Sequence, residues 1–252
     1  MPTALVRPPG PRLAEGLVTH IERRPVDVER AERQWRRYVE ALQDAGWDTV
    51  EVEAAPASPD AVFVEDTVVM FGTLAVITRP GAEERRAETA GTAAVIRRLG
   101  YDVATIESPG TLDGGDVLKV GSTVYVGVGG RSDEAGVSQL AHLIRPTGRT
   151  VIGVPVTKAL HLKSTVTALP DGPVIGFAPL VDDPQVFPRF LAVPEESGAH
   201  VVDLGQHRLL MAADAPRSAA LFRQLGYTPI EVDIGEFQKL EGCVTCLSVR
   251  LR

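Results

Sequence analysis

Hydrophobic and polar positions follow two alternating periods along this chain of 252 residues. Short apolar runs typical of strands come in pairs. Each pair is followed by an amphipathic stretch with helical spacing and then by one more apolar run. The clearest amphipathic stretch covers residues 26–45, which Gly46 ends. The pattern predicts an α/β protein built from repeated strand–strand–helix–strand units.

The predicted elements cover most of the chain. Besides residues 26–45, helices are expected over residues 83–99, 133–143 and 216–225, with a weaker helix within 183–191. Strands or strand pairs are expected over residues 3–8, 47–54, 61–80, 101–107, 114–128, 150–156, 164–177, 200–213, 227–234 and 243–251. Repeats of this length, about 40–50 residues, are typical of an architecture that closes on itself.

The repeats are joined without any linker-like stretch, so a single domain over residues 1–252 is predicted. An open α/β sheet is the competing fold. Periodicity alone does not decide between the two folds.

Composition excludes several classes of protein. The chain is 44% hydrophobic with a net charge of −7, and its basic residues are scattered, which argues against nucleic-acid binding. No apolar run approaches the roughly 20 residues that span a membrane, and the N-terminus lacks the apolar core of a signal peptide. Two cysteines cannot form a disulfide framework, so a cytoplasmic, soluble protein is expected. The sequence is compatible with a homodimer but does not decide it.

The two cysteines, Cys243 and Cys246, lie in a segment that favours a strand. Side chains three positions apart on a strand point to opposite faces, so the thiols are not expected to meet. The two cysteines are also too few for a structural zinc site, because such a site needs four ligands. A redox pair, two buried apolar residues, and one nucleophile with an idle neighbour remain the alternatives.

Acidic residues stand beside several predicted strands. Glu65 and Asp66 are adjacent, so alternation along a strand would turn one of them toward the core, where an unpaired carboxylate is unfavourable. A bound cation would resolve this. Asp113 and Asp116 flank two glycines at the start of another strand, a pattern that is also typical of a plain turn.

Other candidate residues are a histidine and two arginines. His161 lies between leucines, where a structural role in the core is the simpler interpretation. Arg85 and Arg131 follow strands and are either surface residues or a bidentate clamp for a carboxylate. Each signal is weak alone, but together they place Cys, His and several acids at strand ends in different units.

Five motifs occur in an order and spacing shared with one family: VFVEDTVV, ITRPGAEERR, TLDGGDVL, LHLKS and EGCVTCLSV. On these motifs the sequence resembles the dimethylarginine dimethylaminohydrolases, a branch of the guanidine-modifying enzymes that include arginine deiminase. The resemblance spans essentially the whole chain. It implies a pseudo-fivefold α/β propeller of ββαβ units with the site on its axis. It also implies hydrolysis of dimethylarginine to citrulline and dimethylamine without a metal or organic cofactor.

The resemblance also implies roles for individual residues. Cys246 is the expected nucleophile, His161 the catalytic histidine and Asp113 the triad acid, while Cys243 has no inherited role. Asp60 is expected to accept a hydrogen bond from the substrate α-amino group. The expected substrate-binding positions, some acting through backbone atoms, are Leu17, Asp60, Glu65, Asp66, Arg85, Arg131, Leu240 and Thr245.

The expected chemistry suits these residue types. A guanidinium carbon is a poor electrophile, so attack needs a strong nucleophile such as a thiolate, and the cationic substrate can itself favour ionisation of the thiol. Carboxylates of Asp66 and Asp113, supported by Glu65, would hold the guanidinium. Arg85 and Arg131 would bind the α-carboxylate.

Three other functions compete with this hypothesis. An arginine deiminase-like hydrolase would release ammonia from unmethylated arginine. A thiol redox or metal-binding protein would use Cys243 and Cys246 as a pair. A ligand-binding propeller, such as an arginine sensor, would bind without catalysis.

Overall fold

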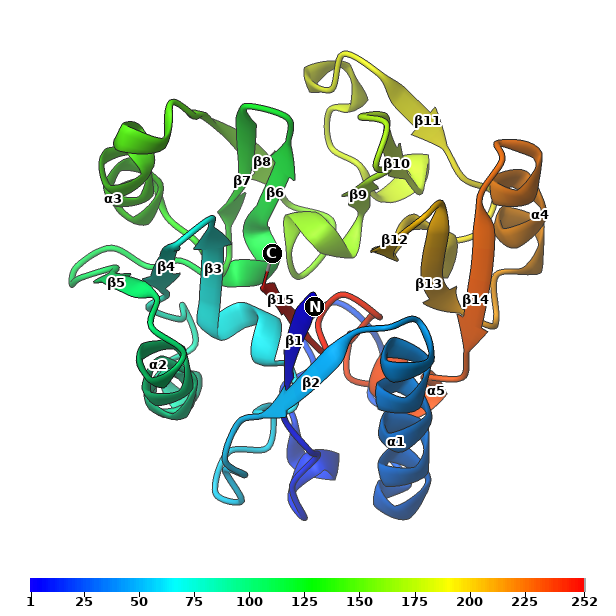
Figure 1. Cartoon of the computed structure of the whole chain (residues 1–252), viewed down its shortest axis with the longest axis horizontal. Helices are drawn as coiled ribbons and strands as arrows, with labels where there is room; N and C mark the ends of the chain where they lie inside the picture. The colour runs from blue at the N-terminus through cyan, green and yellow to red at the C-terminus, as the bar shows by residue number, and fades with distance from the viewer. Residues whose placement is uncertain (252) are drawn as a thin grey trace.

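Five three-stranded sheets surround a common centre in the computed structural model, which describes residues 1–251 (Figure 1). The sheets consist of β15 (Val249–Leu251), β1 (Thr3–Val6) and β2 (Asp48–Glu51); β3 (Val68–Phe71), β4 (Leu74–Ile77) and β5 (Asp102–Thr105); β6 (Val117–Val120), β7 (Thr123–Gly129) and β8 (Thr150–Val156); β9 (Val166–Ala168), β10 (Val174–Gly176) and β11 (Phe190–Ala192); and β12 (Val201–Gly205), β13 (Arg208–Ala212) and β14 (Thr228–Val232). The prediction of an α/β protein built from repeated units is confirmed by these five small sheets.

Each sheet follows the same rule: the middle strand pairs antiparallel with one neighbour and parallel with the other. Four units place a helix before the parallel strand. These helices lie on the outside of the ring (Figure 1): α1 (Val28–Asp44), α2 (Thr89–Arg98), α3 (Glu134–Ile144) and α4 (Pro216–Gln224). A short helix, α5 (Gly235–Gln238), precedes the cysteine segment.

The weak helix predicted within residues 183–191 is wrong. The segment forms a 3-10 turn at Pro184–Val186 and then β11. Pro184 and Pro188 restrict the segment, because proline removes a backbone donor and disfavours a helical conformation in the residue before it.

The two ends of the chain close the ring. β15 pairs antiparallel with β1, which pairs in parallel with β2, so the first unit takes its antiparallel strand, near the centre of the ring, from the C-terminus (Figure 1). The strand predicted over residues 243–251 is therefore only partly correct. Its first half is a turn, and β15 begins at Val249.

The core consists of five hydrophobic clusters, one between each pair of neighbouring units. β3 shows how alternation achieves this. Val68 and Met70 pack toward the unit that contains β1, while Val69 and Phe71 pack toward the unit that contains β6. Both faces of β3 are covered in this way, and all four of its side chains are apolar and buried.

Short 3-10 turns come directly before three of the strands near the centre of the ring. Val64–Thr67 leads into β3, Gly114–Asp116 into β6 and Leu162–Ser164 into β9. The prediction that Glu65 and Asp66 alternate on a strand is thus wrong, because both lie on a turn and both are buried. Within residues 1–251, no helix has the length and apolar character needed to cross a membrane.

Candidate active site

The 3-10 turns place a histidine and two carboxylates together. His161 Nε2 lies 2.9 Å from Asp113 Oδ2, and His161 Nδ1 lies 3.9 Å from Asp66 Oδ1. All three side chains are buried. A Cβ atom added at Gly115 would lie 2.6 Å from His161 Nδ1 and 2.7 Å from Asp66 Oδ1. This packing therefore requires glycine at position 115.

The carboxylates set the protonation state of the imidazole. Burial lowers the pKa of His161, but the charges of Asp66, Asp116 and Asp113 outweigh burial and raise the pKa to about 9. The imidazole is therefore protonated at neutral pH and can donate a proton. Ligand atoms of Asp66, Asp113 and His161 lie within 4.8 Å of one another, close enough to share a metal ion. A metal ion bound there would have to displace that proton.

Arg85 is buried and held by protein groups. Its Nη1 donates to Asp66 Oδ2 at 2.6 Å, and its Nη2 donates to Glu88 Oε2 at 2.8 Å and to two backbone carbonyl oxygens at 3.2 Å. Burial raises the pKa of Asp66, but His161 and Arg85 lower it to about 2. In this conformation Arg85 orients the Asp66 carboxylate. Most of the N–H groups of Arg85 are therefore bonded to the protein, and fewer of them are available to a substrate carboxylate.

The two cysteines share a turn, and the prediction that their side chains point apart is wrong. The Cys246 N–H donates to the Cys243 carbonyl at 3.1 Å, and such a turn brings residues three apart into proximity. The two Sγ atoms are 3.2 Å apart. Tyr38 of α1 fixes the turn, because its hydroxyl donates to the Val244 carbonyl at 2.8 Å and lies 2.7 Å from Ser248 Oγ.

Cys246 is a neutral thiol when the site holds no ligand. Its hydrogen bond with Cys243, its burial, and the nearby carboxylates of Glu65 and Asp66 all raise the pKa of Cys246. A cation placed beside the sulfur would act in the opposite direction. The arrangement thus couples ionisation of the thiol to the arrival of a positive charge.

A small cavity connects these groups. Its volume is about 20 Å³, enough for roughly one water molecule. It is lined by Leu17, Asp60, Phe63, Asp66, Arg85, Arg131, Leu160, His161, Leu240, Glu241, Gly242 and Cys246. Arg131 is only 9% exposed, and among residues 1–251 its guanidinium has no hydrogen-bond partner. A buried, unpartnered guanidinium at a cavity wall is suited to bind a carboxylate.

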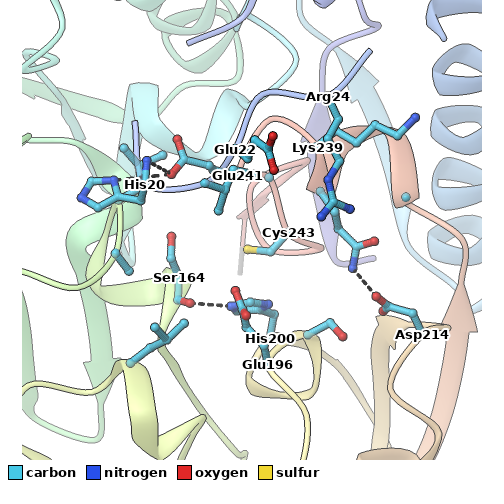
Figure 2. Close-up of a pocket in the computed structure, with 18 of the residues that line it drawn as sticks. His20, Glu22, Arg24, Ser164, Glu196, His200, Asp214, Lys239, Glu241 and Cys243 are labelled. Carbon is cyan, nitrogen blue, oxygen red and sulfur yellow. Dashed lines mark hydrogen bonds and ion pairs between the residues drawn. The ribbon is translucent and has the colours of Figure 1, made fainter. Parts of the chain in front are cut away.

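Residues 16–20 form a strap over this cavity. The Leu17 N–H donates to both carboxylate oxygens of Asp60 at 3.1 Å. The N–H groups of Thr19 and His20 donate to Glu241 at 2.7 and 2.8 Å, as Figure 2 shows for His20. Two carboxylates therefore hold the strap closed, and one of them is the group expected to receive the substrate α-amino group.

Two predicted binding residues do not line the cavity. Glu65 Oε1 accepts from Lys163 at 2.6 Å and from Arg250 at 3.0 Å. The Thr245 hydroxyl lies 3.2 Å from Cys243 Sγ. Asp113 also lies outside the cavity, but it contacts the imidazole that lines it. A role for Glu65 or Thr245 in binding substrate stays a prediction.

Three acidic residues with clear structural roles were not predicted as site residues. Asp116 accepts from the Ser132 hydroxyl at 2.6 Å and from the Leu162 N–H at 2.9 Å, and burial raises its pKa to about 6. Glu88 holds Arg85, and Glu241 holds the strap. Only Asp116 had a sequence signal, since it ends the Asp-Gly-Gly-Asp run.

The buried Cys246 thiol shares a cavity with the protonated His161 imidazole and the Asp66 carboxylate. This arrangement, at the centre of the five sheets, defines an enzyme with a cysteine-containing polar site.

Residues 14–214 match the model of the arginine deiminase family. The dimethylarginine dimethylaminohydrolase of Streptomyces coelicolor is 65% identical over 249 residues, which cover 99% of this chain and 96% of that protein. The enzyme of the same name from Pseudomonas aeruginosa is 34% identical over 252 residues, 98% of each chain. The chain therefore belongs to the arginine deiminase family and, within it, to the dimethylarginine dimethylaminohydrolases.

Solved structures agree with this assignment. The Pseudomonas aeruginosa enzyme, as a cysteine-to-serine mutant complexed with citrulline, matches with a TM-score of 0.91 at 33% identity over 98% of each chain. An adduct of a dimethylarginine dimethylaminohydrolase variant with S-methyl-L-thiocitrulline gives a TM-score of 0.92 at 32% identity. The N-terminal domain of a cyanobacterial arginine dihydrolase has a TM-score of 0.85 at 19% identity, a likeness of fold alone.

Proposed function

We propose that this chain hydrolyses Nω,Nω-dimethylarginine to citrulline and dimethylamine, with Cys246 as the nucleophile. The names of its relatives support the substrate, and the citrulline in the Pseudomonas aeruginosa complex supports the product. The observation that carries the mechanism is that the Cys246 thiol, the protonated His161 ring and the unpartnered Arg131 guanidinium line the same cavity. Together they offer a nucleophile, an acid and a carboxylate receptor.

Binding of the substrate guanidinium activates the thiol. In the site without ligand, the hydrogen bond with Cys243, burial and the charges of Glu65 and Asp66 together keep Cys246 protonated. A guanidinium beside Asp66 neutralises this negative field and adds a positive charge near the sulfur, so the thiolate becomes favoured. The thiolate then attacks the guanidinium carbon and forms a tetrahedral adduct.

His161 supplies the proton that the leaving group needs. A neutral dimethylamine leaves only after its nitrogen is protonated, and the carboxylates keep His161 protonated for that step. The loss of dimethylamine leaves a thiouronium on Cys246. His161, now neutral, takes a proton from water as the water attacks the same carbon. The C–S bond then breaks, which releases citrulline and returns the free sulfur of Cys246.

The substrate's amino-acid end is bound at the other side of the cavity. The proposal pairs Arg131 with the α-carboxylate, and the lack of a hydrogen-bond partner for its guanidinium among residues 1–251 supports this. Asp60 would exchange its bond from the Leu17 N–H for one from the α-amino group. A cavity of about 20 Å³ cannot hold this ligand, so the strap opens before binding and closes afterwards.

We also propose an architecture for the whole chain. The five ββαβ-like units correspond to a pseudo-fivefold α/β propeller that forms one domain, supported by the unbroken ring of hydrophobic clusters. A reducing, cytoplasmic setting is proposed because the nucleophile must remain a free thiol, and both cysteines are free.

The test measures citrulline formed from arginine, monomethylarginine and dimethylarginine in separate reactions, with wild-type protein and with Cys246→Ser. We expect dimethylarginine to give the highest kcat/KM and Cys246→Ser to abolish turnover. A preference for unmethylated arginine, with release of ammonia, would replace the substrate but keep the chemistry. Unchanged citrulline output from Cys246→Ser would overturn the mechanism.

A further inference from the structure

A second, much larger cavity lies on the other side of the cysteine turn. Its volume is about 540 Å³, and Cys243 is part of its wall (Figure 2). Leu160, Glu241 and Gly242 line both this cavity and the small one that contains Cys246. The two sulfurs therefore line different cavities: Cys243 lines the large one and Cys246 the small one.

The sulfurs are nevertheless in contact. Their 3.2 Å separation exceeds a disulfide bond, about 2.0 Å, by only about 1 Å. The turn that joins them already holds residues three apart side by side. Bond formation thus needs a small movement of two side chains and no rearrangement of the five sheets.

We propose that Cys243 is an oxidation site at which a hydroperoxide, arriving through the large cavity, converts Cys243 and Cys246 into a reversible intrachain disulfide. The bond would remove the sulfur nucleophile from the small cavity while the oxidant persists. This inference rests on the proposed function only in treating Cys246 as the nucleophile, since formation of the bond itself is independent of turnover.

The chemistry balances with the hydroperoxide as the sole oxidant. The Cys243 thiolate attacks the outer oxygen of the hydroperoxide, the O–O bond breaks, and an alcohol (water, for hydrogen peroxide) leaves after protonation. Cys243 becomes a sulfenic acid. The Cys246 thiol then loses its proton and attacks the Cys243 sulfur, and hydroxide leaves with that proton as water. Two thiols are oxidised and one peroxide bond is reduced.

The surroundings of Cys243 favour this order of events. The hydrogen bond from Cys246, with further help from His200 and the Thr245 hydroxyl, lowers the pKa of Cys243 despite its burial. A thiolate, not a thiol, reacts with peroxide. Cys246 has the opposite tendency, because Cys243 and two carboxylates raise its pKa. The sulfur that lines the large cavity is thus also the one that ionises first.

The pair would also protect the enzyme from irreversible damage. A sulfenic acid without a neighbouring thiol proceeds to sulfinic acid, which ordinary thiols do not reduce. A sulfenic acid on Cys243 has the Cys246 thiol in contact, so it is captured as a disulfide that small thiols reopen. Removing Cys243 should turn a reversible loss of activity into a slower, permanent one.

The experiment exposes reduced wild-type protein and Cys243→Ser to hydrogen peroxide, then divides each sample and treats half with dithiothreitol. Intact mass, peptide mapping and citrulline formation are measured, and each activity is compared with that of its own untreated protein. We expect wild-type activity to fall about tenfold or more and to return to within about twofold after reduction. Its mass should fall by two hydrogen atoms, with Cys243 and Cys246 in one cross-linked peptide.

Cys243→Ser should lose activity more slowly, gain oxygen atoms on Cys246, and recover less than about a tenth of the loss. Cys243→Ala provides the same comparison if the serine variant does not fold. Two free thiols in inactivated wild-type protein, or equal recovery in wild type and Cys243→Ser, would overturn the proposal. If the protein forms the cross-link but makes no citrulline, the proposed function fails and the oxidation site stands.

Discussion

Replacing Asp113 with asparagine tests how the site keeps its histidine protonated. The substitution preserves size but removes the charge 2.9 Å from His161 Nε2. Asp66 and Asp116 remain, so we expect a partial effect. An opposite charge this close shifts a pKa by roughly 1–3 units, or about 1.4–4 kcal/mol of imidazolium stabilisation. The pKa of His161, about 9 in the native site, should therefore fall toward or below 8.

The imidazole resonances report this change directly by NMR titration, with His161→Phe used to assign the signal. At pH 8, Asp113→Asn should also form citrulline roughly 10–100-fold more slowly, and the deficit should shrink as the pH is lowered and the imidazole regains its proton. Asp182→Asn is a matched control, because Asp182 binds Thr157 at the surface. An unchanged titration of His161 in Asp113→Asn would refute the reasoning.

Three further substitutions probe the cavity. Gly115→Ala puts a methyl group 2.6 Å from His161 Nδ1 and should lower kcat by about 100-fold or more without unfolding the protein. Gly10→Ala is the control: its added methyl group has its nearest contact at 3.6 Å, so its kcat should match that of the wild type in the same assay. Arg131→Gln should raise KM for dimethylarginine by roughly 10–100-fold, since a charge-assisted hydrogen bond contributes about 1.5–3 kcal/mol to binding. A change in kcat alone would argue against a role of Arg131 in binding the substrate carboxylate. Glu241→Gln removes one of the oxygens that accept from the strap, so KM should rise several-fold (about 1 kcal/mol) and proteolysis within residues 16–25 should accelerate; equal proteolysis rates would count against a closing strap.

The fold could be predicted because its signal is repeated. Four helices and the strands around them follow from periodicity. Residues 183–191 were misjudged because two prolines interrupt an otherwise plausible apolar pattern. The closure between β1 and β15 joins residues at opposite ends of the chain, which local patterns do not reveal.

Most of the predicted site residues line the small cavity, but their geometry could not be predicted from the sequence. Glu65, Asp66 and Cys246 were assigned to strands because β-branched neighbours favour strands, yet tertiary contacts hold all three in turns. The Tyr38 hydroxyl, 206 residues away from the Val244 carbonyl that it binds, stabilises the cysteine turn. A contact of this range overrides local propensity, so the meeting of the two sulfurs could be found only in the structure.

The most direct test of the mechanism is covalent capture of the nucleophile. The wild-type protein would be incubated with a reactive chloroacetamidine, with and without excess dimethylarginine, and the modified peptide located by mass spectrometry. We predict a single adduct on the Cys246 sulfur that dimethylarginine suppresses. An adduct on Cys243 instead, or labelling of Cys246 that the substrate does not slow, would contradict the assignment of Cys246 as the sulfur that attacks the guanidinium carbon.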